Sequence, residues 1–184
     1  FLTFHTLREP GDEFIAGRQL YGGSVNQFNH AYKKFDWNVV WADATDPASF
    51  EAALTDKTRA IFIESVANPG GAIIDIPAIA AVAKKACVPL IVDNTMATPY
   101  LCRPFDFGAD LVVHSGDLVD NGNVLSQWDV FFDTTKELMK NTPFYPVLGN
   151  HERNAQHYYD FFYLPTGGGK ENEEQEESHG QNSQ

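Results

Sequence analysis

The chain has 184 residues, of which 43% are hydrophobic, so it can form one core, and its length favours one domain or one domain with an appendage. Its formal net charge of -12 argues against non-specific binding to nucleic acid or to an anionic membrane, because both require an excess of Lys and Arg. No apolar run approaches the ~18 residues of a membrane span. These bounds favour a role with a small-molecule substrate.

The two cysteines, Cys87 and Cys102, have no CxxC spacing and predict no disulfide framework. This usage is typical of a reducing compartment, so a cytoplasmic location is expected. The chain begins at Phe1, and its first residues, FLTFHTLREP, lack the basic region of a signal peptide. We interpret this start as a cut inside a domain.

Over the first 115 residues, short apolar segments alternate with segments of helical pattern. Strands are predicted in GDEFIAG and over residues 38–41, 59–64, 89–93 and 110–114. Helices are predicted over residues 2–7, after the glycine turn with Ser24 as N-cap, from Asp46-Pro47 through Leu54, and near residues 77–86.

Several of these strands are continuously apolar, and the strand at 110–114 has the pattern of one buried on both faces. Strands of that kind separated by helices predict a three-layer α/β fold, with a mostly parallel sheet and helices on both faces. In such sheets, ligands bind outside the carboxyl ends of the strands.

A different pattern follows residue 115. Residues 124–140 predict a long helix, residues 143–148 a strand that ends in GNHE, and the aromatic-rich residues 154–163 a helix or an irregular segment that packs back. From Gly167 onward no apolar residue can offset the entropy of ordering, and five glutamates face one lysine. Residues 166–184 are therefore expected to be an acidic disordered tail.

Four separated segments carry a resemblance to a known enzyme family. GDEFIAGRQLYGGS, IFIESVANPGG, PLIVDNTMATPYL and GADLVVHS resemble the pyridoxal-phosphate (PLP) enzymes of Cys/Met metabolism, in particular the O-acetylhomoserine sulfhydrylase branch. The resemblance covers residues 1–115 and implies the core of the large domain of PLP fold type I. The parent family is homo-oligomeric.

The resemblance implies a role for five residues. Asp93 would hold the pyridinium nitrogen in its protonated form, and Tyr21 would stack on the cofactor ring. Asn68 would reach the phenolic oxygen with Glu64 in support, and Ser115 would contact the phosphate.

The sequence departs from this family directly after Ser115. There the family has the lysine that binds the cofactor covalently, within two or three residues of VVHS, but this chain continues with GDLVDNG. The parent reaction would be a γ-replacement in which O-acetylhomoserine loses acetate and gains sulfide, giving homocysteine. Without the lysine, the chain as given is expected to be inactive in that reaction.

GDLVDNG and GNHE resemble a second family, the calcineurin-like metallophosphoesterases. The resemblance implies that Asp117 bridges two metal ions, that Asn150 is a metal ligand, and that His151 is the catalytic residue. A divalent metal such as Mn²⁺ would be the cofactor. The family's opening DxH and later GHxH elements have no counterpart here, so weak binding is expected.

We therefore interpret the chain as an apparent chimera joined at Ser115/Gly116. Residues 1–115 would be a partial PLP-dependent transferase domain, residues 116–165 a partial metallophosphoesterase segment, and residues 166–184 the tail. The main hypothesis is a fragment of a transsulfuration enzyme. A metal-dependent phosphohydrolase and a non-catalytic chimeric product are the alternatives.

Overall fold

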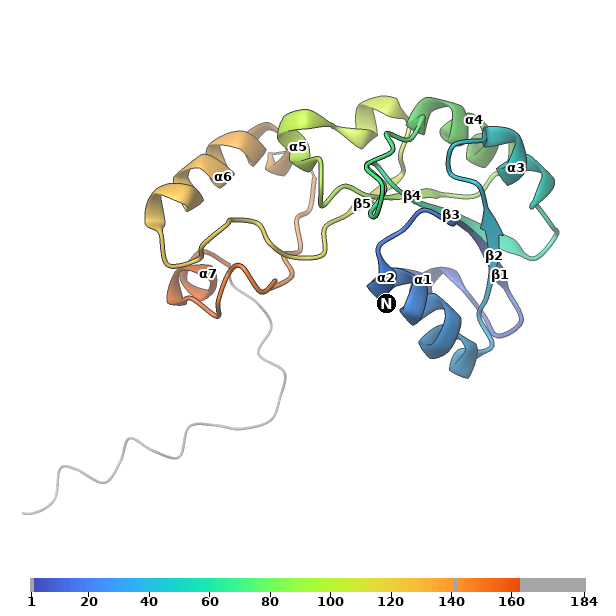
Figure 1. Cartoon of the computed structure of the whole chain (residues 1–184), viewed down its shortest axis with the longest axis horizontal. Helices are drawn as coiled ribbons and strands as arrows, with labels where there is room; N and C mark the ends of the chain where they lie inside the picture. The colour runs from blue at the N-terminus through green and yellow to red at the C-terminus, as the bar shows by residue number, and fades with distance from the viewer. Residues whose placement is uncertain (1, 141, 163–184) are drawn as a thin grey trace, which may run out of the picture.

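The computed structural model describes residues 2–140 and 142–162. Five parallel strands form one sheet in the order β2-β1-β3-β4-β5, as Figure 1 shows. Their bounds are β1 Glu13–Gly17, β2 Asn38–Ala42, β3 Thr58–Glu64, β4 Leu90–Asp93 and β5 Leu111–Val113. The predicted parallel α/β fold is confirmed.

Helices cover both faces of the sheet. In Figure 1, α1 and α2 lie on one side of the strands, and α3 and α4 lie on the other. The helices are α1 Leu2–Leu7, α2 Gly22–Asn26, η1 Gln27–Ala31, η2 Tyr32–Phe35, α3 Pro47–Ala52, α4 Ile76–Ala86, α5 Thr98–Leu101, η3 Pro104–Phe107, α6 Leu125–Met139 and α7 Gln156–Phe161.

Each face of the sheet has its own apolar cluster. Alternate strand residues point to opposite faces, so Ile63 and Val92 pack on the α3 and α4 side, whereas Phe62 and Ile91 pack on the α1 and α2 side. The side chain of Asp46 caps α3 by accepting a hydrogen bond from the Ala48 N–H (3.1 Å), directly before Pro47, as predicted.

Two local helix predictions are wrong. The helix after the glycine turn begins at Gly22, with Tyr21 as its N-cap residue, because the Val25 N–H already bonds to the Tyr21 carbonyl (3.1 Å). Ser24 is therefore inside the helix. The α3 helix ends at Ala52, short of Leu54.

The strand β5 is only partly buried, because it lies at the edge of the sheet and pairs with β4 alone.

Residues 143–148 form no strand. Pro143 and Pro146 lack the N–H groups that a strand needs for pairing, and Tyr145 is 86% exposed. The predicted strand over residues 143–148 is therefore wrong, whereas the long helix predicted before it is confirmed as α6.

Residues after Ser115 build a third apolar cluster, which is strongly aromatic. Trp128 of α6 is fully buried against Tyr158 and Phe162, and its indole N–H donates to the Gly122 carbonyl (2.8 Å). The residues of this cluster all follow Ser115, whereas those of the two sheet clusters all precede it. The predicted tail, residues 166–184, lies outside the described residues.

A buried carboxylate joins the loop after β5 to the turn before α7. Glu152 is fully buried and accepts hydrogen bonds from the N–H groups of Gly149 (2.6 Å), Asp117 (2.9 Å) and Val119 (3.2 Å). A Cβ on Gly116 would lie 2.6 Å from the Gly149 Cα, so the two backbone segments touch only because both residues are glycines. None of the helices within the described ranges has the length and hydropathy to cross a bilayer.

The Glu152→Gln variant should unfold more easily than the parent chain. The amide NH2 cannot accept from the backbone N–H groups that face one carboxylate oxygen, so buried donors lose their acceptor, at a cost of about 1–3 kcal/mol. Urea unfolding measures this difference. The exposed Glu137, substituted in the same way, is the matched control and should stay within about 0.5 kcal/mol of the parent. Equal stability of the two variants would show that Glu152 does not hold these segments together.

Candidate functional site

The carboxyl ends of three neighbouring strands bring the first group of predicted site residues to one edge of the sheet. Glu64 ends β3 and pairs in register with Asp93, which ends β4, and Asp93 pairs with Val113 of β5. Ser115 follows Val113 by two residues. Because Glu64 and Asp93 have the parity of Phe62 and Ile91, both carboxylates point toward the α1 and α2 face.

A hydrogen-bonded chain connects Asp93 to Ser115. The Oδ1 atom of Asp93 accepts from the Thr95 hydroxyl (2.5 Å) and from the Thr95 N–H (3.0 Å). The Thr95 hydroxyl oxygen in turn accepts from the Ser115 N–H (2.9 Å) and lies 3.0 Å from the Ser115 Oγ. Thr95 thus fixes the half-buried carboxylate of Asp93 relative to the exposed Ser115.

Glu64 organises the neighbouring group. Its buried carboxylate accepts from the N–H groups of Tyr21 (2.7 Å) and Asn68 (3.1 Å), so it holds the start of α2 and the loop after β3 against the strand end. Burial raises the pKa of Glu64, and the nearby Asp93 carboxylate adds to this rise, whereas the two backbone hydrogen bonds oppose it. The edge therefore has two adjacent carboxyl groups.

The Tyr21 ring lies over a glycine. Its side chain is 58% exposed, and a Cβ on Gly23 would lie 2.5 Å from the Tyr21 Cε1 atom. Any other residue at position 23 would displace the ring. This contact explains why the second glycine of YGGS is needed for the observed position of the Tyr21 ring.

Two residues that the sequence analysis did not assign to the site lie within it. Thr95 bridges Asp93 and Ser115. The sequence could have indicated this contact, because an Asp side chain readily accepts a hydrogen bond from the residue two positions later. His114 is half-buried between Asp93 and Asp117, and its Nδ1 atom accepts from the Gly116 N–H (3.2 Å). Burial lowers the pKa of His114, and the neighbouring carboxylates partly oppose this.

The second group of predicted residues also comes together. The Oδ1 atom of Asp117 accepts from the His151 N–H (2.9 Å), and the His151 Nδ1 lies 3.0 Å from the Asp120 carbonyl oxygen. The hydrogen bond to Asp120 raises the pKa of His151, and the Asp117 charge adds to this. Asp117 and His151 lie close together because Glu152 and the contact between Gly116 and Gly149 hold their two segments against each other.

This second group fits a binuclear metal centre poorly. Within residues 2–140 and 142–162, no group of three or more His, Cys, Asp or Glu residues could hold a metal ion. One oxygen of Asp117 already accepts from a backbone N–H, and the Glu152 carboxylate is used by three such groups. Asn150, the other predicted ligand, is exposed.

Two family models match the chain, consistent with a joined sequence. The model of Cys/Met metabolism PLP-dependent enzymes matches residues 1–123, and the model of calcineurin-like phosphoesterases matches residues 97–181. The two matches overlap over residues 97–123, so the boundary at Ser115/Gly116 stays a prediction.

Relatives of the chain include enzymes of sulfur amino-acid metabolism. O-acetyl-L-homoserine sulfhydrylase from Leptospira meyeri is 45% identical over 62% of this chain and 26% of its own length. Homocysteine/cysteine synthase from Saccharomyces cerevisiae is 32% identical over 77% of this chain and 32% of its own length. The chain thus spans about a quarter to a third of these relatives.

Two solved structures of related enzymes are also similar to the chain. An O-acetylhomoserine (thiol)-lyase structure from Campylobacter jejuni, which contains pyridoxyl-lysine monophosphate, is 38% identical and covers 64% of this chain and 30% of its own, with a TM-score of 0.62. Cystathionine gamma-lyase from Lactobacillus plantarum is 28% identical and covers 80% of this chain and 40% of its own, with the same TM-score. With the family model matching two thirds of its residues, the chain belongs to the Cys/Met metabolism PLP-dependent enzymes.

Proposed function

We propose that the carboxyl edge of β3, β4 and β5 binds pyridoxal phosphate without a covalent bond. This edge would be the cofactor-binding site of a transsulfuration enzyme fragment. The observation that carries this proposal is the hydrogen-bonded chain from Asp93 through Thr95 to Ser115. It holds a carboxylate and a set of hydroxyl and N–H groups in one fixed arrangement, on the edge where parallel sheets bind ligands.

The residues present fit the two ends of this cofactor. Asp93 would stabilise the positive charge on the ring nitrogen by a charge-assisted hydrogen bond, and its Oδ1 is already oriented by Thr95. Ser115 would contact the phosphate, and Tyr21, held over Gly23, would pack against the ring. When bound, the cofactor supplies an electron sink for carbanion chemistry.

Glu64 and Asn68 would support the oxygen side of the ring. Glu64 contributes indirectly, because its carboxylate fixes the backbone of both Tyr21 and Asn68. The repulsion between Glu64 and Asp93 in the free protein would also favour a cationic ring beside them.

The reaction that we propose for the parent enzyme is the γ-replacement of O-acetylhomoserine by sulfide to give homocysteine, as the names of the relatives suggest. This chain would not complete it. Gly116, Asp117 and Leu118 occupy the positions where the family's lysine is expected. The lysines in or beside the helices are exposed: Lys33, Lys34, Lys84, Lys85, Lys136 and Lys140.

The proposed organisation follows the apolar clusters. Residues 1–115 would form the cofactor-binding part, residues 116–165 the second segment and residues 166–184 an acidic tail, and the separate aromatic cluster around Trp128 supports this division. As in the parent family, the partners would be a small-molecule substrate and further copies of the chain, in the cytoplasm.

Pyridoxal phosphate should bind the full chain reversibly. Equilibrium dialysis should detect binding, and borohydride reduction followed by peptide mapping should label no single lysine. The Asp93→Asn variant should bind roughly tenfold more weakly or worse, because a hydrogen bond to a charged group contributes about 1.5–3 kcal/mol. Asp129→Asn, an exposed change on α6, is the matched control and should bind like the parent. A single labelled lysine, or equal affinity of the two variants, would contradict the proposal.

A metal-dependent phosphohydrolase is the second candidate, because Asp117 and His151 do meet. The ligand set is too sparse for a tight centre, so we expect Mn²⁺ binding only on the order of millimolar and negligible phosphatase turnover.

Calorimetric titration of the chain with Mn²⁺ should therefore give little heat, and the Asp117→Ala variant should behave like the parent. Micromolar binding that this substitution abolishes would establish a metal centre and favour the second candidate.

A further inference from the structure

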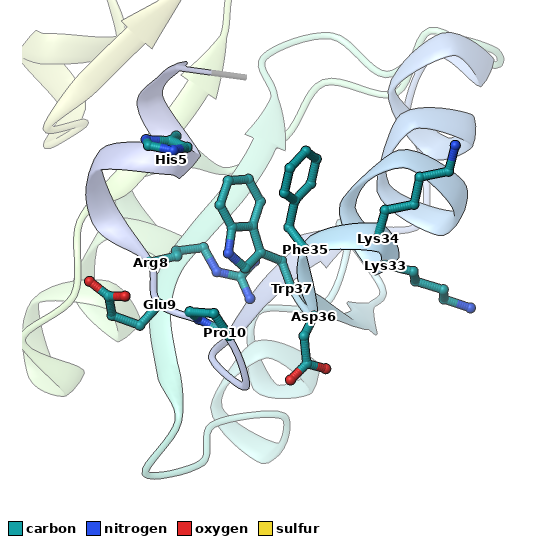
Figure 2. Close-up of a pocket in the computed structure, with 9 residues that line it drawn as sticks. All are labelled: His5, Arg8, Glu9, Pro10, Lys33, Lys34, Phe35, Asp36 and Trp37. Atoms are coloured by element: carbon teal, nitrogen blue, oxygen red, sulfur yellow. The ribbon is translucent and has the colours of Figure 1, made fainter.

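The cavity between the end of α1 and the turn that follows η2 is not a ready ligand site. It has a volume of about 530 Å³, and its lining includes Arg8, Phe35 and Trp37, as Figure 2 shows. Arg8 and Trp37 are only 4% and 3% exposed, and the Trp37 ring stacks on Phe35 with ring centroids 5.1 Å apart. Neither the guanidinium nor the indole therefore presents a free face to the cavity. A reactive dipeptide without an assigned role lies instead in the second segment.

Asn121 precedes Gly122 in GDLVDNG, and it is the only asparagine of the sequence that is followed by glycine. This dipeptide favours attack of the glycine nitrogen on the asparagine side chain, because glycine has no Cβ to hinder the approach and its backbone turns freely. The Gly122 nitrogen forms a bond to the Asn121 Cγ, and the bond from Cγ to the side-chain nitrogen breaks. That nitrogen leaves as ammonia with the amide proton. Water then opens the cyclic imide at one of its two carbonyl groups, giving aspartate or isoaspartate.

The packing of the second segment requires this glycine. Gly122 is buried, and a Cβ there would lie 2.1 Å from the Glu152 carbonyl oxygen. The Gly122 carbonyl oxygen also accepts from the indole N–H of Trp128 (2.8 Å), at the centre of the aromatic cluster. A residue with a side chain, which would hinder the attack, does not fit at this position. The fold therefore keeps Asn121 in the dipeptide in which asparagine is most reactive.

The folded chain holds both reacting groups in hydrogen bonds. The Gly122 N–H donates to the His151 carbonyl oxygen (3.1 Å), so the nitrogen that must lose its proton is paired as well as buried. The Asn121 Oδ1 accepts from the Asn123 N–H (3.2 Å), and the Asn121 N–H donates to the Gln127 Oε1 (2.7 Å). Attack on Cγ requires the bond to His151 to break. The reaction therefore depends on local opening of the segment.

We propose that Asn121 is a deamidation site, and that the contact between the loop after β5 and the turn before α7 keeps it closed. When the turn leaves the loop, the Gly122 N–H loses its acceptor and becomes accessible to base. Aspartate adds a negative charge directly after Asp120, and isoaspartate also adds a carbon to the main chain. Because Gly122 lies tightly against the Glu152 carbonyl, the lengthened chain cannot restore the contact. Deamidation thus makes the opening permanent.

The full chain tests this proposal when it is incubated in mildly alkaline buffer, with and without enough guanidinium chloride to unfold it. Peptide mapping by mass spectrometry separates the asparagine, aspartate and isoaspartate forms. Asn121 should react roughly tenfold or more slowly in the folded chain, because only the opened fraction can react. Asn123, which precedes the β-branched Val124, is the internal control and should keep its amide in both conditions. Equal rates at Asn121 with and without denaturant, or no faster reaction there than at Asn123 in the unfolded chain, would overturn the proposal.

Glu152→Gln tests whether the proposed contact closes the site. It weakens the attachment of the turn to the loop after β5, so deamidation of Asn121 in buffer should be roughly fivefold faster or more, with the rate in denaturant unchanged. Glu137→Gln, the exposed control, should react like the parent. An unchanged rate in Glu152→Gln would contradict the role of this contact. If Glu152→Gln does not fold, the parent chain with and without denaturant still decides the question.

Discussion

The parallel register of β3, β4 and β5 is the constraint on which the candidate site depends. It sets Glu64 beside Asp93 and Asp93 beside Val113, so that three strand ends deliver their polar residues to one edge and one face. A slip of one residue in either pairing would turn a carboxylate to the opposite face, into the apolar cluster under α3 and α4. Phe62 and Ile91 oppose such a slip, because it would remove their side chains from the apolar cluster on the α1 and α2 side of the sheet.

Beyond that edge, hydrogen bonds rather than apolar packing hold the loops in place. Glu64 fixes the backbone of the two flanking loops, and Thr95 connects Asp93 to the loop after β5. That same loop then enters the second segment, where Glu152 binds it by two N–H groups. The loop after β5 is therefore held from both sides, by a hydroxyl from the sheet and by a carboxylate from the following segment, with His114 between them. Asp117 and His151 meet as a result of this anchoring, and their contact alone does not make a metal centre.

Much of the sheet could be predicted from the sequence, because the apolar runs AIFI in β3 and LIV in β4 are typical of strands covered on both faces. Two expectations failed for different reasons. The exposure of β5 depends on which strand lies at the edge of the sheet, which the sequence does not show. The absence of a strand over residues 143–148 could have been predicted, because Pro143 and Pro146 lack the N–H groups that pairing needs. The site residues of the first group came from a family resemblance, and their roles stay proposals. Glu152 was assigned no role because its partners, Asp117 and Val119, lie more than 30 residues away in sequence.

We propose that the sheet edge at Asp93 and Ser115 retains cofactor binding, although the residues after Ser115 resemble a different family. Amide chemical shifts of the full chain, recorded by NMR during titration with pyridoxal phosphate, test it most directly. Saturable shifts are expected at the amides of Tyr21, Thr95 and Ser115, with the amides of α6 unchanged. Shifts confined to the exposed lysines, or spread over the second segment, would contradict it.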